Sequence, residues 1–382
     1  MRHDKTLSPT IRHAVKIRLK THNLDKRTNK ATVILYTDRS DNFPDYRPVR
    51  KLSEVHSDTP LSVSLISTVK NEIDSVSIWF ESIIHGSRHP EEIVIVDAGS
   101  DDGTFKTLQE LLSGCSIPFS LLSEPGINIA QGRNIAISEA QHAIIACTDF
   151  GGYPRTDWLD RLIKPFEDNR EIEVTAGWYE AVDRNGQPFH RRRWPTLEQV
   201  NPDNFIPSSR SIAFKKSAWV AAGGYPEWLT LTGEDTCFAA ELKKKTRLWA
   251  FVPDAVVEWH APDDIRSYWR KQYQWSIGDG EACLNTAYYR SNVIQISIIL
   301  FGTFAALMLV FFGISSQSFL SATLGLLIAA VLMLIIITRT QRAGQGLGDI
   351  PWEIGAKFAQ MLGFIRGCVN RVKIVQRNNR QK

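Results

Sequence analysis

Residues 93–104 read I-V-I-V-D-A-G-S-D-D-G-T. The four β-branched residues at its start predict a buried strand, and Asp97 stands where that strand ends. Small residues at 98–100 predict a turn, after which Asp101 and Asp102 open a helix. Because ligands bind outside the carboxyl ends of strands in open α/β sheets, we interpret this stretch as half of a nucleotide pocket, with Asp97 facing a ribose hydroxyl or a base N–H. The alternative is a plain turn and helix cap, since aspartate favours both positions.

Strands and helices alternate on both sides of this stretch. Strands are expected at residues 61–68, 92–97, 118–122 and 143–149, and helices at 72–85, 103–112 and 130–140. This order predicts an α/β fold with a mostly parallel sheet that helices cover on both faces. Beyond residue 157 the pattern loosens, with helices expected at 158–166 and 234–245, strands at 172–176, 208–214 and 248–260, and one long helix at 265–289.

Composition excludes some classes of protein. The length of 382 residues suits one large domain or two ordinary ones, and a net charge of only +4 argues against nucleic acid as a partner. The five cysteines are scattered and form no C-x-x-C pair, which argues against a disulfide framework or a zinc site and fits a reducing compartment. The polar start M-R-H-D-K is followed by no apolar run, so a cleaved signal peptide is not expected.

Two uncharged apolar segments, residues 293–314 and 319–338, predict a transmembrane hairpin. Each is close to the ~20 residues that cross a ~30 Å hydrocarbon core. The alternative is a pair of buried helices in a soluble protein. Arg290 precedes the first segment, and Arg339 and Arg342 follow the second. The positive-inside rule then places both ends, and everything before them, in the cytoplasm, so we expect a multi-pass protein of the inner (cytoplasmic) membrane.

We expect four divisions of the chain. A polar extension covers residues 1–60, a catalytic α/β domain 61–290, the hairpin 291–338 and a basic amphipathic cytoplasmic tail 339–382. The apolar run at 32–36 in the extension is expected to add an edge strand or to contact anionic headgroups. Apolar residues recur at near-helical spacing over 352–372, between basic residues, which predicts an amphipathic helix on the membrane interface.

Five short motifs follow one another through the α/β region. They are S-T-V-K-N-E (67–72), D-A-G-S-D-D-G-T (97–104), A-Q-G-R-N-I-A-I-S-E-A (130–140), C-T-D-F-G (147–151) and G-E-D-T-C-F (233–238). In this order and at this spacing they resemble the family 2 glycosyltransferases of GT-A fold, over roughly residues 61–280. The resemblance implies a Rossmann-like mixed sheet, an inverting mechanism and a UDP-, GDP- or dTDP-linked sugar donor. The hairpin is similar to that of many bacterial members that act at the cytoplasmic face.

The resemblance assigns residues to the nucleotide. It puts Thr68, Glu72 and Asp97 around the nucleoside, and Arg133 against the base or the phosphates. An arginine suits phosphate because its fork is bidentate and always charged. The alternative is a surface arginine on an amphipathic helix. Asp149 takes the place of the first aspartate of the family's D-x-D motif, which binds the nucleotide and its metal.

The resemblance also implies a divalent metal ion. Gly151 occupies the place of the second aspartate, so the chain departs from the motif there. Mg²⁺ often takes one or two carboxylates together with phosphates and waters, so Mg²⁺ or Mn²⁺ at Asp149 remains feasible. His260 follows a strand where related enzymes place a histidine that contacts metal or phosphate, and Mn²⁺ would tolerate an imidazole ligand. The alternative is a structural histidine.

Glu234 and Asp235 form the acid pair that the chemistry needs. Displacement at the anomeric carbon requires a base for the proton of the acceptor hydroxyl. Asp235 matches the family's base, and Glu234 would shape the acceptor site. The alternative is an acidic first helical turn favoured by the helix dipole. Trp275 would stack on an acceptor sugar, or simply pack. It lies where processive synthases carry Q-x-x-R-W, which this chain lacks, so processive synthesis is disfavoured.

We therefore expect a membrane-anchored inverting glycosyltransferase of the hexosyltransferase type. Its acceptor would be a hydroxyl on a lipid-linked or cell-surface glycan precursor. Two alternatives stay open. The first is a polyprenyl-phosphate sugar synthase, and the second is a catalytically inactive, membrane-tethered nucleotide- or glycan-binding protein, which the missing second aspartate suggests.

Overall fold

The structure is a computed structural model that describes residues 34–36, 61–183, 186–187, 197, 200–201, 205–342 and 346–380. The rest of the expected N-terminal extension lies outside these residues. Within it, β1 (Ile34–Tyr36) pairs antiparallel with β9 (Trp249–His260). The expected edge strand is therefore present.

One mixed sheet organises the described part of the chain. Its strand order is β1-β9-β7-β8-β5-β2-β3-β4, and β6 pairs with β9 off this path. The remaining strands are β2 (Val63–Val69), β3 (Glu92–Asp97), β4 (Phe119–Ser123), β5 (Ile144–Cys147), β6 (Gly152–Pro154), β7 (Val174–Val182) and β8 (Ile212–Lys215). Strands β5, β2, β3 and β4 are parallel, whereas β8 runs antiparallel to both of its neighbours. The predicted mostly parallel α/β fold is confirmed.

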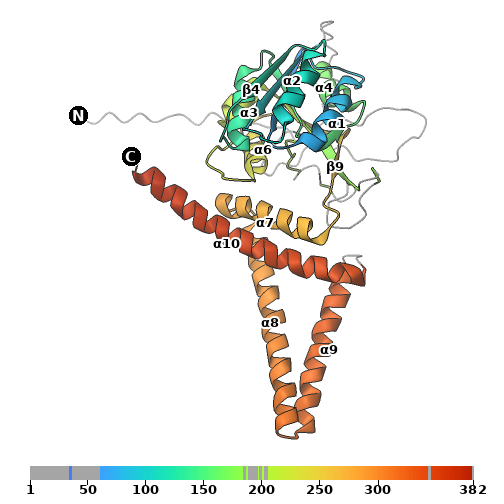
Figure 1. Cartoon of the computed structure of the whole chain (residues 1–382), viewed down its shortest axis with the longest axis vertical. Coiled ribbons are helices and arrows are strands. Elements are labelled where there is room, and N and C mark those ends of the chain that lie inside the picture. Colours follow the sequence, from blue (N-terminus) through green and yellow to red (C-terminus); the bar gives the residue numbers. More distant parts are fainter. Residues whose placement is uncertain are drawn as a thin grey trace, which may run out of the picture.

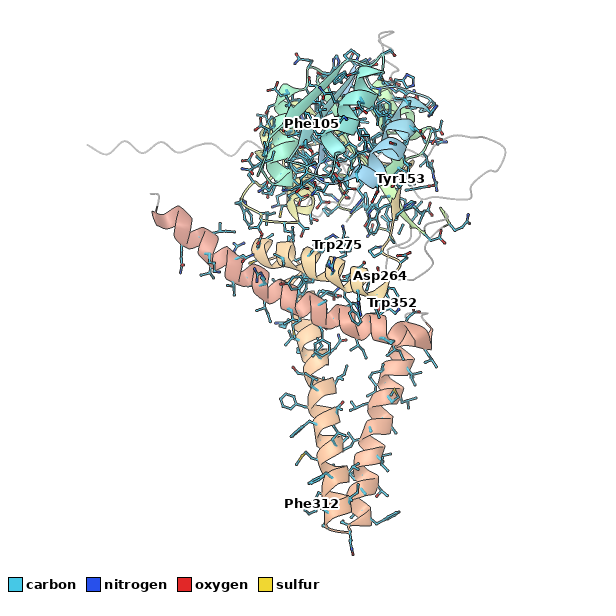
Figure 2. All side chains as sticks on the ribbon, viewed as in Figure 1. Phe105, Tyr153, Asp264, Trp275, Phe312 and Trp352 are labelled. Carbon is cyan, nitrogen blue, oxygen red and sulfur yellow. The ribbon has the colours of Figure 1, made fainter. Side chains whose placement is uncertain are left out.

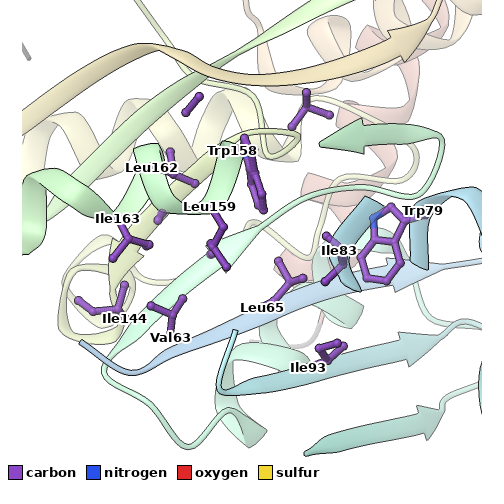
Figure 3. Packing of buried hydrophobic residues seen from close by; sticks show 14 of the residues in the cluster. Val63, Leu65, Trp79, Ile83, Ile93, Ile144, Trp158, Leu159, Leu162 and Ile163 are labelled. Atoms are coloured by element: carbon purple, nitrogen blue, oxygen red, sulfur yellow. The ribbon is translucent and has the colours of Figure 1, made fainter. Parts of the chain in front are cut away.

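Both faces of the sheet are buried because its central strands are largely apolar, with apolar side chains on both faces. Alternate residues enter two separate cores, so that Leu65 and Ile93 pack on one face and Ile66 and Val94 on the other. Helices α1 (Ile73–Ile84), α2 (Thr104–Ser113) and α4 (Trp158–Asp168) cover the first face. Helices α3 (Ile129–Glu139), α5 (Lys216–Ala222) and α6 (Glu234–Lys245) cover the second. Figure 3 shows Trp79 of α1 beside Ile83 and above the first face.

The prediction of one long helix over residues 265–289 is wrong. It is two helices, α7 (Ile265–Ala282) and α8 (Thr286–Ser315). Between them Cys283 and Asn285 adopt left-handed backbone conformations, with φ of 56° and 52°. A left-handed residue ends the regular helical hydrogen-bond pattern, and the backbone N–H of Leu284 instead donates to the carbonyl of Asp279. The chain therefore turns between α7 and the apolar segment.

Helices α8 and α9 (Phe319–Arg342) extend side by side away from the α/β domain (Figure 1). Residues Thr286–Ser315 and Phe319–Thr338 are long and apolar enough to cross a membrane, with mean hydropathies of 2.4 and 2.8. Only 11% and 6% of their most apolar windows are buried inside the protein. The alternative of core helices in a soluble protein requires the opposite, since a core helix buries its apolar side chains.

Helix α10 (Ile350–Arg380) lies along α7, between the hairpin and the α/β domain (Figure 1). The two helices approach closely because glycines meet. A Cβ on Gly367 would lie 2.1 Å from the carbonyl oxygen of Ile277, and one on Gly280 would lie 2.3 Å from that of Phe364. On the far side of α10 the exposed apolar residues form a stripe: Leu362, Ile365, Val369 and Val372. This stripe is the surface that the expected contact with the membrane interface would use.

Candidate active site

A cavity of about 1020 Å³ lies where the loops after β2, β5 and β9 meet the start of α6 and one side of α7. Eight of the nine side chains predicted from the sequence line it: Thr68, Glu72, Arg133, Asp149, Glu234, Asp235, His260 and Trp275. They come from distant segments of the chain and meet because β2 and β5 are neighbours in the sheet, α3 packs on β2, and the start of α6 and one side of α7 line the same cavity. The ninth residue is Asp97.

Asp97 ends β3 as predicted, but its carboxylate is occupied by its own turn. It is 1% exposed and accepts hydrogen bonds from the backbone N–H groups of Gly99 and Ser100, both at 3.0 Å, and from the Ser100 hydroxyl. Its neighbour Ala98 lines the cavity instead. These contacts are those of the plain turn, the alternative interpretation of this stretch. A contact of Asp97 with the nucleoside stays a prediction.

Arg133 is the electrostatic centre of the site. Its side chain is 1% exposed, and its guanidinium donates to Asp149 at 2.5 Å and to Glu234 at 2.6 Å. The same group lies over the ring of Tyr225, 5.2 Å from the centroid. It is therefore not the surface arginine of the alternative reading. Burial opposes the charge of Asp149, but Arg133, then Arg210 and Lys271, hold the pKa of that carboxyl below its usual value.

The acid pair divides into one fixed and one available carboxylate. Glu234 is buried and bound to Arg133, and its burial raises its pKa despite that partner. Asp235 is half-buried, with one oxygen accepting from the backbone N–H of Thr236 at 2.7 Å and the other from Ser208 Oγ at 3.1 Å. Gly233, with φ of 89°, places both at the first turn of α6. Of these two carboxylates, only Asp235 has no ion pair among the described residues.

Two half-buried cations of the cavity wall, Arg210 and Lys271, were not predicted from the sequence. Arg210 precedes β8 and lies over the rings of Tyr179 and Trp259, 5.0 and 4.9 Å from their centroids. Lys271 of α7 lies 5.9 Å from the ring centroid of Trp275, one helical turn away. The spacing of Lys271 and Trp275 puts them on one helix face, a signal available in the sequence. Arg210 carried no such signal.

The donor set fits a divalent metal poorly. His260 ends β9 and is exposed, with its ring 4.9 Å from that of Tyr153. In the described parts of the chain, no three side chains of histidine, cysteine, aspartate or glutamate gather as a metal-ligand cluster. Asp149 already binds Arg133 and feels the charges of Arg210 and Lys271. The predicted ligation by Asp149 and His260 thus gains no support from the geometry.

Trp275 faces the α/β domain from α7, which lies between that domain and α10 (Figure 2). Its ring is tilted against that of Trp259, with centroids 6.1 Å apart, and a third aromatic ring, that of Tyr179, packs on the same group. Both the stacking and the packing interpretations are compatible with this place. Its contact with an acceptor sugar stays a prediction.

Known proteins resemble this chain in sequence and fold. The family model "Glycosyl transferase family 2" matches residues 64–221, and "Glycosyl transferase family group 2" matches residues 200–338. A poly-beta-1,6-N-acetyl-D-glucosamine synthase of Staphylococcus epidermidis is 23% identical over 280 residues, which are 69% of this chain and 66% of that protein. The O-antigen chain rhamnosyltransferase RfbN of Salmonella typhimurium is 22% identical over 197 residues, 47% of this chain and 62% of that protein. The chain thus spans just under two thirds of the length of these relatives.

Among solved structures, the mannosyltransferase PcManGT from Pyrobaculum calidifontis, in complex with GDP-Man and Mn²⁺, superimposes with a TM-score of 0.50. The identity is 18%, and the match covers 85% of this chain and 91% of that one. At this identity the likeness concerns the fold. The two family matches, which together cover residues 64–338, show that this chain belongs to the family 2 glycosyltransferases.

Proposed function

We propose that the chain transfers a sugar, with inversion, from a nucleotide-sugar to an acceptor hydroxyl at the cytoplasmic face of a membrane. One observation carries the proposal. Asp149, Arg133, Glu234 and Asp235 come from three separate segments and converge in one cavity, and of these three carboxylates only Asp235 has no ion pair among the described residues.

The reaction needs one proton transfer and one displacement. Asp235 takes the proton of the acceptor hydroxyl, and the acceptor oxygen attacks the anomeric carbon. The bond from that carbon to the diphosphate breaks, and the nucleoside diphosphate leaves with the electron pair. Glu234 is suited to positioning rather than to proton transfer, because Arg133 holds its carboxylate at 2.6 Å.

The nucleoside would lie against the ends of β2 and β3. Thr68 and Glu72 line the cavity there, and Asp97 lies just behind its wall. The hydroxyl of Thr68 is buried and has no hydrogen-bond partner within the described residues. Because an unsatisfied buried hydroxyl is costly, it is a natural partner for a ribose or base group.

The acceptor is proposed to be a lipid-linked or cell-surface glycan precursor. The wall of the cavity on the side of the hairpin is α7, which packs on α10. If the hairpin spans the membrane, the cavity stands one helix pair above the bilayer. The two curated relatives are named for a poly-N-acetylglucosamine and for an O-antigen chain.

The sequence implied Mg²⁺ or Mn²⁺ as the partner of the diphosphate. A metal ion would supply positive charge to the leaving group, and Asp149, with His260, is the ligand that the sequence offers for it. The solved mannosyltransferase contains Mn²⁺. In this chain the residues fit that ion poorly, because Asp149 already binds Arg133 and His260 is exposed.

The test uses the full chain in lipid nanodiscs with a panel of UDP-, GDP- and dTDP-sugars. We expect one donor to be hydrolysed or transferred, and Asp235→Asn to lower turnover about a hundredfold or more while nucleoside diphosphate affinity is kept. Asp160→Asn, on the exposed side of α4, is the matched control. A loss of less than about tenfold in Asp235→Asn would favour an acceptor that is already ionised, as in a polyprenyl-phosphate sugar synthase. Binding without turnover of any donor would favour the inactive binding protein.

A further inference from the structure

Arg210 and Lys271 are two cations of the cavity wall that have no carboxylate within ion-pair distance among the described residues. Each is half-buried and lies against aromatic rings. Arg210 lies between the rings of Tyr179 and Trp259 and donates to Ser208 Oγ at 3.2 Å, and Lys271 lies near the ring of Trp275. Aromatic faces hold a cation in place while leaving its hydrogen-bond donors free for a ligand.

These cations line the same cavity as the position where the family's motif has lost its second carboxylate. Gly151 stands there, and a Cβ built on it would lie 3.9 Å from Glu72 Oε2. Lys271 is attracted to both Glu72 and Asp149 and is repelled by Arg210, although neither carboxylate lies within ion-pair distance of it. A lysine ammonium thus lines the same cavity as these two carboxylates and adds positive charge near them.

We propose that Lys271 and Arg210 bind the diphosphate of the sugar donor in place of a divalent metal, so that nucleotide binding by this chain does not require one. The inference rests on the proposed function and concerns the same site. It is an alternative to the Mg²⁺ or Mn²⁺ dependence that the D-x-D resemblance implied, which stays a prediction.

The chemistry of the two side chains suits this role. A guanidinium presents a planar fork of donors to phosphate oxygens, and an ammonium offers a compact point charge with three donors. When the bond from the anomeric carbon to the diphosphate breaks, the electron pair stays on the phosphate oxygen. Neither cation takes part in a proton transfer, and both stabilise that charge where it develops. A divalent ion at Asp149 would instead stand close to Arg133, Arg210 and Lys271, which are all positively charged.

Calorimetry on the full chain in nanodiscs tests the proposal without any turnover. UDP, GDP and dTDP are titrated in EDTA and again with MnCl₂. We expect one of them to bind in EDTA, with Mn²⁺ changing its Kd by less than about threefold. Lys271→Met should weaken binding in EDTA by roughly tenfold to a hundredfold, as for the loss of one charge-assisted hydrogen bond. Lys271→Arg, which keeps the charge, should bind within about threefold of the original protein and shows that the fold is retained.

Lys106→Met is the matched control, because Lys106 is an exposed lysine of α2 with its side chain 82% accessible, and it should change nothing. Removal of Lys271 should also make binding depend on Mn²⁺, since Asp149 and Glu72 are then left without that cation. Binding of the unmodified protein only in the presence of Mn²⁺ would overturn the inference while leaving the proposed function intact. Binding by Lys271→Met in EDTA that is as tight as that of the unmodified protein would also overturn the inference and leave the proposed function intact. If no nucleoside diphosphate binds with or without Mn²⁺, the proposed function fails as well.

Discussion

Replacement of Arg133 by methionine tests the electrostatic centre of the site. The guanidinium is 1% exposed and neutralises two carboxylates, Asp149 and Glu234, whose side chains are 21% and 7% exposed. Methionine keeps much of the apolar volume and removes the charge. Both carboxylates then stay in the wall of the cavity without their principal partner.

The expected loss of stability is large for a single substitution. Breaking a buried ion pair by removing one partner costs roughly 3–5 kcal/mol, because an uncompensated charge remains. For a domain of this size each kcal/mol lowers the melting temperature by about 2–4 °C, so the decrease should be about 6–20 °C. Thermal unfolding of the full chain in detergent, followed by near-UV circular dichroism, measures it. Arg155→Met is the control, since Arg155 also binds two carboxylates but is 44% exposed and should cost only about 0–1 kcal/mol.

The pH dependence distinguishes charge from packing. The pKa of Glu234 in the folded state is already raised, so its contribution to stability decreases as the pH rises from its unfolded pKa through the folded one. The pKa of Asp149 is lowered in the folded state, so its charge stabilises the fold above its unfolded pKa. This stabilisation is lost as the pH falls through the folded pKa, and it depends on Arg133. Without Arg133 both folded pKa values rise, so the deficit of the variant should be greater near pH 8 than near pH 5. An equal deficit at both values would refute the electrostatic argument and indicate lost packing on Tyr225 instead.

Three further outcomes are expected. Asp235→Asn should keep the melting temperature within about 2 °C while lowering turnover, because its carboxylate has no ion pair in the described chain; differential scanning fluorimetry checks this. Glu281→Ala should cost about 1–3 kcal/mol in urea unfolding, since that fully buried carboxylate accepts from the backbone N–H and hydroxyl of Thr230. Gly367→Ala should also destabilise by about 1–3 kcal/mol, because its Cβ would meet a carbonyl of α7 at 2.1 Å, whereas Gly348→Ala meets nothing and should be close to neutral.

Local patterns predicted most of the secondary structure. The strand at Glu92–Asp97 was predicted to the residue, and α6 begins and ends at the residues predicted for it. Burial of both sheet faces follows from runs of β-branched residues, which are visible without any tertiary contact. The two uncharged segments likewise predicted α8 and α9. The break at Cys283 was missed, because left-handed backbone at a cysteine has no pattern in the surrounding sequence.

The site required the tertiary structure. Eight of the nine residues chosen from the motifs line one cavity. The partner of each charged group could not be chosen in this way, because it depends on which segments the fold brings together. Asp97 was expected to face a ligand, but its carboxylate is held by the turn that follows it. Arg133 was expected against the base or phosphate, and it lies buried between Asp149 and Glu234, which are 16 and 101 residues away in the chain.

Short-range periodicity in the amino-acid sequence was sufficient for the elements of this protein, because the burial of a strand or helix face depends on residues a few positions apart. The charges of its cavity follow a different rule. Coulombic interactions depend on distance in space and on burial, and Lys271 of α7 comes near Asp149 and Glu72 only because α7 and the loops after β2 and β5 line one cavity. The fold and the family could therefore be predicted from residue order, whereas the pairing of its acids and bases was decided by long-range packing.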